Sequence, residues 1–139
     1  MKLIYLDTNI WIDFWENRSD GLRPLGEFAF NVLKRAYNCE FKVVVSSILM
    51  AELKFNYGAE TVMEMLKDLR RSKKHIYIYA DKEHNKSALE YSKKTGIGFN
   101  DCLHAVLAKA RGCDCLVTQN MKHFERLEFL IKPKFPGDL

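Results

Sequence analysis

Short apolar runs alternate with stretches of helical periodicity along the chain. The run over 2–6 is continuous rather than alternating, which is typical of a strand buried on both faces, and 42–45 (Lys-Val-Val-Val) repeats the pattern. Further strands are predicted over 75–79, 115–118 and 129–131. Helices are predicted over 8–15, 24–38, 47–57, 60–71, 81–96, 101–111 and 121–126. This alternation of strands and helices predicts an α/β fold with a mostly parallel sheet.

Some helix ends carry recognisable signals. Ser46 or Ser47 and Asn100 are expected to cap the helices that they precede. The helix over 101–111 has hardly any polar face, so we expect it to be deeply packed. Because neither an internal repeat nor a long linker divides the chain, we expect a single domain over 1–139.

Composition narrows the class of protein. Hydrophobic residues make up 47% of the 139 residues and charged ones 29%, as in ordinary globular domains, which excludes an intrinsically disordered chain. No apolar run approaches the roughly 20 residues that a membrane span needs, and the first residues show no signal-peptide pattern. The four cysteines fit neither a zinc site nor a disulfide framework. We therefore expect free thiols in a cytoplasmic protein that does not bind a membrane.

The net charge of +4 is unevenly distributed. Residues 1–66 hold 7 Lys and Arg against 9 Asp and Glu, whereas residues 67–139 hold 15 against 9. A basic half favours a polyanionic partner such as nucleic acid, because each neutralised phosphate releases counterions. A solvated basic surface explains the same charge equally well, so charge alone leaves both interpretations open.

Four polar residues fall near the expected carboxyl ends of strands, where parallel sheets bind ligands. Asp7 ends the first strand, and Glu52 lies in the helix after the second. Asp101 stands in the first turn of the most apolar helix, and Asn120 follows the fourth strand. Carboxylates gathered at one edge repel one another unless a cation binds them, and their hard oxygens suit Mg²⁺ or Mn²⁺. Together the acids predict a metal site that activates water against a phosphodiester.

Each acid also has a simpler interpretation. Asp101 alone would complement the helix dipole, Glu52 alone would be a solvated helix residue, and Asp7 alone would be a cap or turn residue. Asp7-Thr8-Asn9 is also similar to the motif of phosphatases with an aspartyl nucleophile, but Asn9 stands where they have a second acid. We expect Asn9 instead to hydrogen-bond the loop beside Asp7.

Four motifs occur in an order that resembles one known family. They are Leu6-Asp7-Thr8-Asn9, Ala51-Glu52-Leu53, Asn100-Asp101-Cys102-Leu103-His104-Ala105 and Val117-Thr118-Gln119-Asn120-Met121-Lys122-His123-Phe124. Together they resemble the PIN domain, and most of all the small VapC-type toxins of toxin–antitoxin pairs. The resemblance spans nearly the whole chain and depends on the order and spacing of motifs that are individually unspecific.

The resemblance implies a three-layer α/β/α fold with a central, mostly parallel sheet of about five strands. It implies hydrolysis of RNA by water with Mg²⁺ or Mn²⁺, leaving a 3′-hydroxyl and a 5′-phosphate. Asp7, Glu52 and Asp101 match the acidic positions of the family and are the expected metal-binding and catalytic residues. Thr118 matches the residue that supports this site. The implied partners are RNA, a cognate antitoxin and a second copy of the chain in a homodimer.

Asn120 departs from the family, which often has an acid at this position. With three carboxylates rather than four, we expect one firmly held metal ion and a second that arrives only with substrate. The asparagine can still offer a carbonyl oxygen or orient a water on the metal. Which acid serves as general base stays open.

Basic residues near the acids are candidates for substrate contacts. Lys122 and Arg126 lie near the expected metal edge and are predicted to contact phosphates. His104 lies one turn after Asp101 on the same helix face, where it is either a substrate contact or a hydrogen-bonded, partly buried residue. Asp13 is expected at the surface.

The sequence therefore predicts a metal-dependent endoribonuclease that is the toxin of a toxin–antitoxin pair. A housekeeping RNA-processing nuclease would have the same chemistry, and a catalytically idle RNA-binding or scaffold domain would accommodate Asn120. The aromatic cluster Trp11, Phe14 and Trp15 is expected in the core, with a groove for an antitoxin helix as the alternative.

Overall fold

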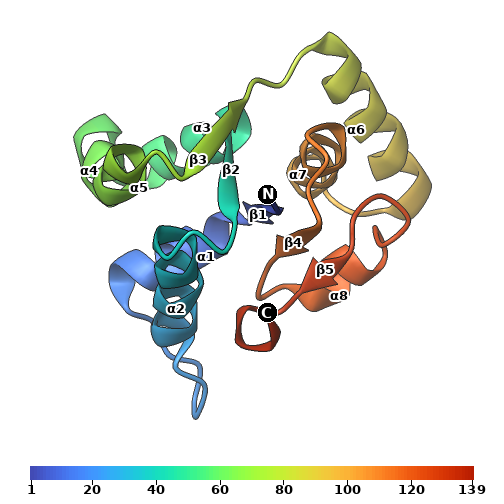
Figure 1. The fold of residues 1–139 in the computed structure, drawn as a ribbon. Helices are drawn as coiled ribbons and strands as arrows, with labels where there is room; N and C mark the ends of the chain where they lie inside the picture. The colour runs from blue at the N-terminus through green and yellow to red at the C-terminus, as the bar shows by residue number, and fades with distance from the viewer.

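The computed structural model describes the whole chain, residues 1–139. A single five-stranded sheet lies at its centre, in which all neighbouring strands are parallel and the order is β3-β2-β1-β4-β5 (Figure 1). The strands are β1 (Leu3–Leu6), β2 (Lys42–Ser46), β3 (His75–Ile78), β4 (Cys115–Val117) and β5 (Pro133–Lys134). The predicted α/β fold with a parallel sheet of about five strands is confirmed.

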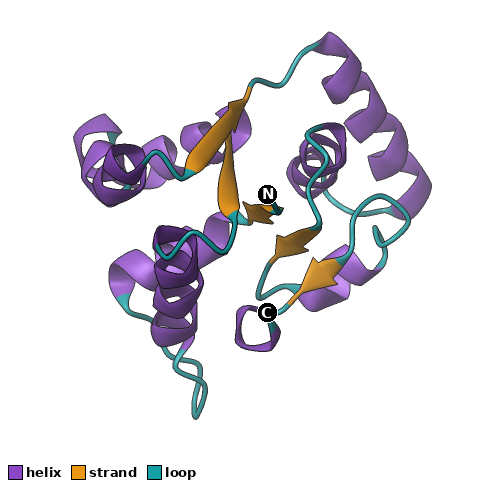
Figure 2. Cartoon of the chain, in the orientation of Figure 1, coloured by secondary structure: helices purple, strands orange, loops and turns teal.

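Helices cover both faces of the sheet and make it the middle of three layers (Figure 2). One face carries α1 (Thr8–Glu16), α2 (Leu25–Tyr37), α3 (Ser47–Tyr57), α4 (Ala59–Met65) and α5 (Lys67–Ser72). The other face carries α6 (Lys82–Thr95), α7 (Phe99–Ala110) and α8 (Met121–Glu125). A 3₁₀ helix over Pro136–Asp138 follows the last strand.

The pleat of β1 distributes its side chains between two separate cores. Ile4 and Leu6 belong to the core under α1–α5, whereas Tyr5 belongs to the core under α6–α8. Tyr5 is fully buried there among mostly apolar side chains. A buried hydroxyl needs a hydrogen-bond partner. Because Tyr5 precedes Asp7 by only two residues, the partner of its hydroxyl is expected directly behind the predicted site.

Helix ends agree with the sequence in one case and differ in another. Ser46 caps α3 by accepting the backbone N–H of Leu49 at 3.2 Å, as expected. Asn100 does not cap α7, so that prediction is wrong: the helix begins two residues earlier than predicted, at Phe99 after Gly98, without a side-chain cap. The deep packing of this helix is confirmed, since residues 102–108 are all buried.

Two predicted elements differ from the structure. The helix predicted over 60–71 is two helices, because the backbone at Leu66 leaves the helical conformation with φ −96° and ψ 0°. The strand predicted over 129–131 is wrong, since these residues form a turn in which Phe129 is exposed. The fifth strand lies further along at Pro133, on the edge of the sheet where a missing N–H is tolerated.

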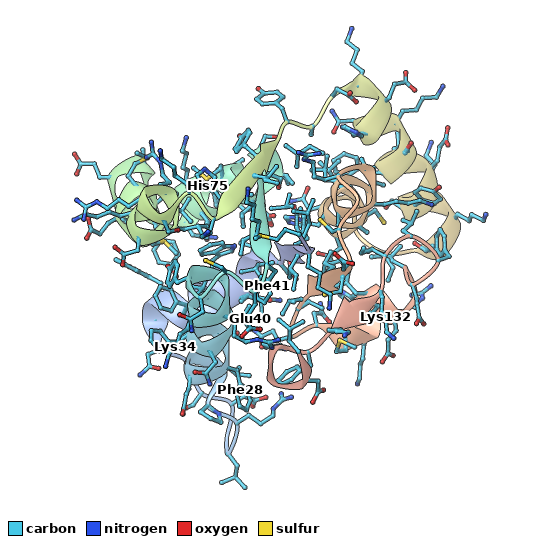
Figure 3. The ribbon with its side chains drawn as sticks, in the orientation of Figure 1. Phe28, Lys34, Glu40, Phe41, His75 and Lys132 are labelled. Atoms are coloured by element: carbon cyan, nitrogen blue, oxygen red, sulfur yellow. The ribbon has the colours of Figure 1, made fainter.

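Large side chains fill the space between the sheet and α1–α5 (Figure 3). Phe41, labelled in Figure 3, is 2% exposed, and the guanidinium of Arg35 lies 5.6 Å from its ring. Trp11 of the predicted aromatic cluster is buried in this core, Phe14 packs against it, and Trp15 lies at the surface. None of the helices has the length and apolar character that a membrane crossing requires.

Candidate active site

The acids lie where the order of the strands reverses. From β1 the chain passes first through β2 and β3 on one side, and then through β4 and β5 on the other. Parallel sheets bind ligands at the carboxyl edge beside such a reversal. Asp7 directly follows β1, and its backbone N–H donates to the carbonyl of Val117 at 2.9 Å. The ends of β1 and β4 are therefore joined at the site.

Asp7 is buried and held by three hydrogen bonds. Its Oδ1 accepts the backbone N–H of Thr8 at 2.8 Å. Its Oδ2 accepts the hydroxyl of Thr118 at 2.8 Å and the amide of Asn9 at 3.1 Å. Burial raises the pKa of Asp7, although the charge of His104 and the hydrogen bond from Thr118 oppose the shift. Two of the three residues predicted to support the site, Thr118 and Asn9, thus contact this acid, whereas Asn120 does not.

Glu52 stands in α3 and reaches back toward Asp7. Its Oε1 accepts the hydroxyl of Thr8 at 3.0 Å and lies 2.5 Å from Nε2 of His104. Burial on its own raises the pKa of Glu52, but the hydrogen bond and charge of His104 outweigh it, so the pKa lies below its ordinary value. Thr8 therefore joins two acids that are far apart in the sequence, since its backbone contacts Asp7 and its hydroxyl contacts Glu52.

His104 lies inside the protein, with 1% of its side chain exposed. Its Nδ1 is 2.5 Å from the hydroxyl of Tyr5, and its Nε2 is 2.5 Å from Glu52 and 4.0 Å from Oδ1 of Asp7. Burial lowers the pKa of His104, but the hydrogen bond to Glu52 and the neighbouring carboxylate charges raise it more. Both ring nitrogens are occupied, so the structure places this residue behind the acids and not on the surface where a phosphate would meet it.

Asp101 lies in the first turn of α7 and is held more loosely. Its Oδ2 is 3.1 Å from Nδ1 of His123, which is in turn 2.8 Å from Nδ2 of Asn120. The backbone N–H of Asn120 donates to the hydroxyl of Thr118 at 2.9 Å. Sequence reasoning missed His123, although its position three residues after Asn120 places it one helical turn away.

The amino-acid sequence from residue 4 to residue 130 matches the model of a single family, the PIN domain. The chain belongs to the PIN domain family. Members of this family are typically nucleases and typically use a divalent metal ion. No curated protein matches the chain significantly.

Solved structures with this PIN fold include chains from toxin–antitoxin complexes. The first such chain belongs to VapBC2 from Rickettsia felis, whose crystal structure includes a DNA fragment from the promoter. Its TM-score to this chain is 0.68 at 22% identity, and the match covers 96% of this chain and 98% of that chain. One in VapBC-1 from nontypeable Haemophilus influenzae has a TM-score of 0.64 at 23% identity, covering 96% and 98%. VapC20 of Mycobacterium tuberculosis, a toxin that cleaves the sarcin–ricin loop, has a TM-score of 0.54 at 16% identity, covering 81% and 86%. At these identities the likeness shows the fold alone.

The acids of this PIN domain suit a hard divalent cation by their chemistry. Asp7, Glu52 and Asp101 offer carboxylate oxygens, the donors that Mg²⁺ and Mn²⁺ prefer, and the charge of Asp101 acts on Asp7 and raises its pKa. No three His, Cys, Asp or Glu side chains converge closely enough to hold a metal ion as they stand. Instead, Glu52 is paired with His104 and Asp101 with His123. A cation bound by all three acids would have to draw Asp101 away from its histidine.

The two basic residues predicted to contact phosphates differ in their surroundings. Lys122 is exposed in α8, two residues after Asn120. The guanidinium of Arg126 donates to the carbonyl of Thr95 at the end of α6. Arg126 is thus already engaged within the fold, which leaves Lys122 as the freer cation.

Asp13 corrects an expectation, because it is fully buried rather than at the surface. Both of its carboxylate oxygens accept from Nε2 of Gln119, at 3.1 and 3.0 Å. Burial raises its pKa to about 6 against the opposing effects of Arg18 and Gln119. The cause is the close approach of α2 to the end of α1: a Cβ at Gly26 would lie 2.8 Å from the carbonyl oxygen of Asp13. This contact buries the face of α1 that carries Asp13, which the sequence pattern predicts to be exposed.

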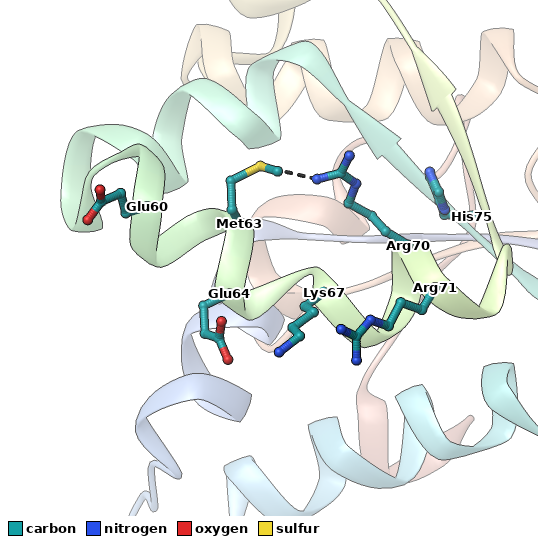
Figure 4. A pocket seen from close by; sticks show the side chains of 7 residues that line it. All are labelled: Glu60, Met63, Glu64, Lys67, Arg70, Arg71 and His75. Atoms are coloured by element: carbon teal, nitrogen blue, oxygen red, sulfur yellow. Dashed lines mark hydrogen bonds between the residues drawn. The ribbon is translucent and has the colours of Figure 1, made fainter.

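The largest hollow on the surface is formed by α4, α5 and β3 (Figure 4). Its volume is about 660 Å³, and its lining comes from α4, α5 and the start of β3: Glu60, Met63, Glu64, Lys67, Arg70, Arg71 and His75. His75 begins β3, so this hollow lies toward the amino end of the strand, whereas the acids lie at the carboxyl ends. Its charges have both signs, and it contains none of the acids described above.

A smaller hollow of about 290 Å³ adjoins one of the acids, Glu52. It is lined by Ile48, Ala51, Glu52, Phe55, Asn56 and Asn100. Phe55 is 92% exposed, and Asn56 donates its side-chain amide to the carbonyl of Glu52 at 3.0 Å. An exposed aromatic ring beside two carboxamides offers a stacking surface and hydrogen-bonding groups next to Glu52.

Proposed function

We propose that this PIN domain is a divalent-metal-dependent endoribonuclease and the toxin of a toxin–antitoxin pair. The observation that carries the proposal is the placement of Asp7, Glu52 and Asp101 at the reversal of strand order in a PIN fold. The hydrogen bonds that Thr8 makes to Asp7 and Glu52 support it, because they hold two of the acids side by side.

In this proposal the metal ion is Mg²⁺ or Mn²⁺, which when bound lowers the pKa of a water molecule and neutralises charge on the phosphodiester. Asp7, Glu52 and Asp101 bind it through oxygens. Thr118 and Asn9 orient the carboxylate of Asp7 from behind. Such orientation matters because metal sites need ligands whose positions are set before the cation arrives.

Asn120 supports a site with one firmly held ion. Its carboxamide lies beside His123 rather than beside Asp7, and it carries no charge to balance a second cation. We propose that a second ion enters only with the phosphates of the substrate, which supply the missing negative charge.

RNA is proposed to approach over the hollow beside Glu52. An unpaired base would stack on Phe55, whose ring is almost fully exposed. Lys122, which is exposed in α8 two residues after Asn120, is proposed to contact a phosphate of the same RNA. Single-stranded RNA fits this arrangement because its bases are free to leave the stack.

The experiment that tests the proposal is cleavage of a labelled single-stranded RNA pool. We expect cutting with Mg²⁺ or Mn²⁺, none with EDTA, and none by Asp101→Asn. Asp68→Asn in α5 is the matched control, because it makes the same change far from the acids and should cut normally. Failure of the wild-type protein to cut under either metal would contradict the proposal.

The toxin role rests on the fold shared with chains of toxin–antitoxin complexes. We propose a cognate antitoxin protein and a homodimer as the assemblies of this chain. Induced expression is expected to arrest growth, and Asp7→Asn to relieve the arrest. A small gene overlapping the start of this one would support a toxin, whereas its absence together with harmless expression would favour a housekeeping nuclease.

A catalytically idle RNA-binding domain is the second candidate, and one observation favours it. No three ligating side chains converge, and Asn120 stands where the family often has an acid. Retention of labelled RNA without cutting, under both metals, would support this alternative.

A further inference from the structure

A chain of buried polar side chains lies directly behind Glu52. It runs from Ser46 at the end of β2, through Tyr5 in β1, to His104 in α7. Ser46 and Tyr5 are fully buried, and His104 is 1% exposed. Substrate and solvent therefore cannot reach any of these three side chains, so whatever His104 contributes must act through the residue that it contacts.

The hydrogen-bond directions along this chain follow from the chemistry of its ends. An ionised carboxylate only accepts, so Nε2 of His104, 2.5 Å from Glu52, must carry a proton. In the neutral ring Nδ1 accepts from the hydroxyl of Tyr5 at 2.5 Å, and the hydroxyl of Ser46 donates to Tyr5 at 2.6 Å; in the protonated ring Nδ1 donates to Tyr5, which then donates to Ser46. Ser46 itself accepts the backbone N–H of Leu49. Every polar atom of the chain has a partner in this arrangement.

Glu52 depends on this chain for its position. Apart from His104, its carboxylate has one hydrogen-bond partner, the hydroxyl of Thr8 at 3.0 Å. About a quarter of its side chain is open to solvent, so without the imidazole the carboxylate would be free to rotate away from Asp7. A ligand that is free to rotate must lose that freedom when a cation binds, which weakens binding.

We propose that His104 is a positioning residue of the candidate metal site: it fixes the carboxylate of Glu52 by donating from Nε2, while Tyr5 fixes the ring through its hydrogen bond with Nδ1. This inference rests on the proposed function, in which Glu52 binds the metal. Of the two roles that the sequence left open for His104, a substrate contact or a hydrogen-bonded buried residue, it takes the second.

The experiment is titration of the metal-free protein with Mn²⁺, followed by electron paramagnetic resonance of the free ion. His104→Phe keeps an aromatic ring but removes the donor, and we expect Mn²⁺ binding about 10- to 100-fold weaker, as for other residues that orient a metal ligand. His104→Gln restores a donor near the position of Nε2 and should recover most of that loss. Combined with Glu52→Gln, His104→Phe should cause no further loss, because the group that it orients is already gone.

Val106→Ala controls for simple destabilisation. It removes buried methyl groups from the same helix without touching Glu52, so it should lower the melting temperature and leave Mn²⁺ affinity unchanged. If His104→Phe does not fold, Tyr5→Phe takes its place, since it deletes one oxygen atom and should weaken Mn²⁺ binding by a smaller factor.

Unchanged Mn²⁺ affinity in the folded His104 or Tyr5 variant would overturn the inference, as would equal losses in His104→Gln and His104→Phe. RNA cleavage is measured separately on the same proteins. A wild-type protein that binds Mn²⁺ but does not cut RNA would sink the nuclease proposal and leave the positioning role intact. Absence of Mn²⁺ binding by the wild-type protein would overturn both.

Discussion

Glu52 and Asp101 are almost equally exposed, at 28% and 29% of their side chains, yet their surroundings differ completely. Glu52 is backed by His104, which is 1% exposed and fixed by Tyr5, whereas Asp101 is backed by His123, which is 53% exposed. The exposure of an acid therefore does not tell how firmly it is placed. The Glu52 side of the site is set before any ligand arrives, and the Asp101 side can adjust to one.

Replacing the acids themselves should lower cleavage more than any other change and should separate the buried Asp7 from the partly exposed Asp101. Asp7→Asn and Asp101→Asn should each lower the rate of RNA cleavage by on the order of 10²–10³-fold, because each removes charge from the site. Only Asp7→Asn should raise the melting temperature of the metal-free protein at neutral pH. Burial raises the pKa of Asp7, so its ionised form costs stability that a neutral amide does not. Equal melting temperatures for the two variants would contradict the distinction.

Asp13 is a further buried acid, and it should make the stability of the folded protein depend on pH. Its pKa of about 6 lies above the ordinary value of 3.8, so the folded protein binds this proton more tightly than the unfolded chain. Stability contributed by protonated Asp13 is present below about pH 4 and is lost as the pH rises to about 6, by at most about 3 kcal/mol. Asp13→Asn should not show this loss.

The measurement for Asp13 is the difference in melting temperature between the wild-type protein and Asp13→Asn across that pH range. The difference is needed because other acids shift in the opposite direction; the pKa of Glu16, for example, is lowered by Tyr57 and Arg18. A difference that stays constant from pH 4 to pH 7 would show that Asp13 titrates normally.

A new acid on the Asp101 side of the site tests whether negative charge limits the affinity for a cation. Asn120→Asp should tighten Mn²⁺ binding about tenfold, because one more carboxylate faces the cation in a partly solvated site. Asn38→Asp is the control, since it makes the same change at the end of α2. Weaker binding in Asn120→Asp would mean that its carboxamide already serves the site through His123.

The sequence predicted most of the fold because its strongest signals are local. The apolar runs of β1 and β2 and the apolar α7 appear in the structure where the pattern places them. The last strand was missed because two paired residues on an edge, one of them Pro133, carry no alternating pattern. Asp13 was misplaced because its burial depends on the packing of α2 against α1, which no single helix encodes.

The site was predicted in part for the same reason. Acids at the carboxyl ends of strands follow from topology, so Asp7 and Glu52 were expected near each other, and Thr8 joins them. Their partners were not predictable, since the contact between Tyr5 and His104 spans 99 positions of the chain. Only the packing of β1 against α7 in the folded protein brings the hydroxyl of Tyr5 to the imidazole of His104.

His123 and His104 are the same residue type and differ in burial, so replacing His123 should have only a small effect on Mn²⁺ binding. His123→Ala removes the partner of Asp101 and should change Mn²⁺ affinity by less than about fivefold, since exposed ion pairs contribute about 0.2–1 kcal/mol. The direction should be tighter binding, because Asp101 no longer has to leave a histidine to reach the cation. The same titration on His104→Phe should show weaker binding. If both variants weaken binding equally, then His123 places Asp101 as firmly as His104 places Glu52, and the two sides of the site do not differ as their burial indicates.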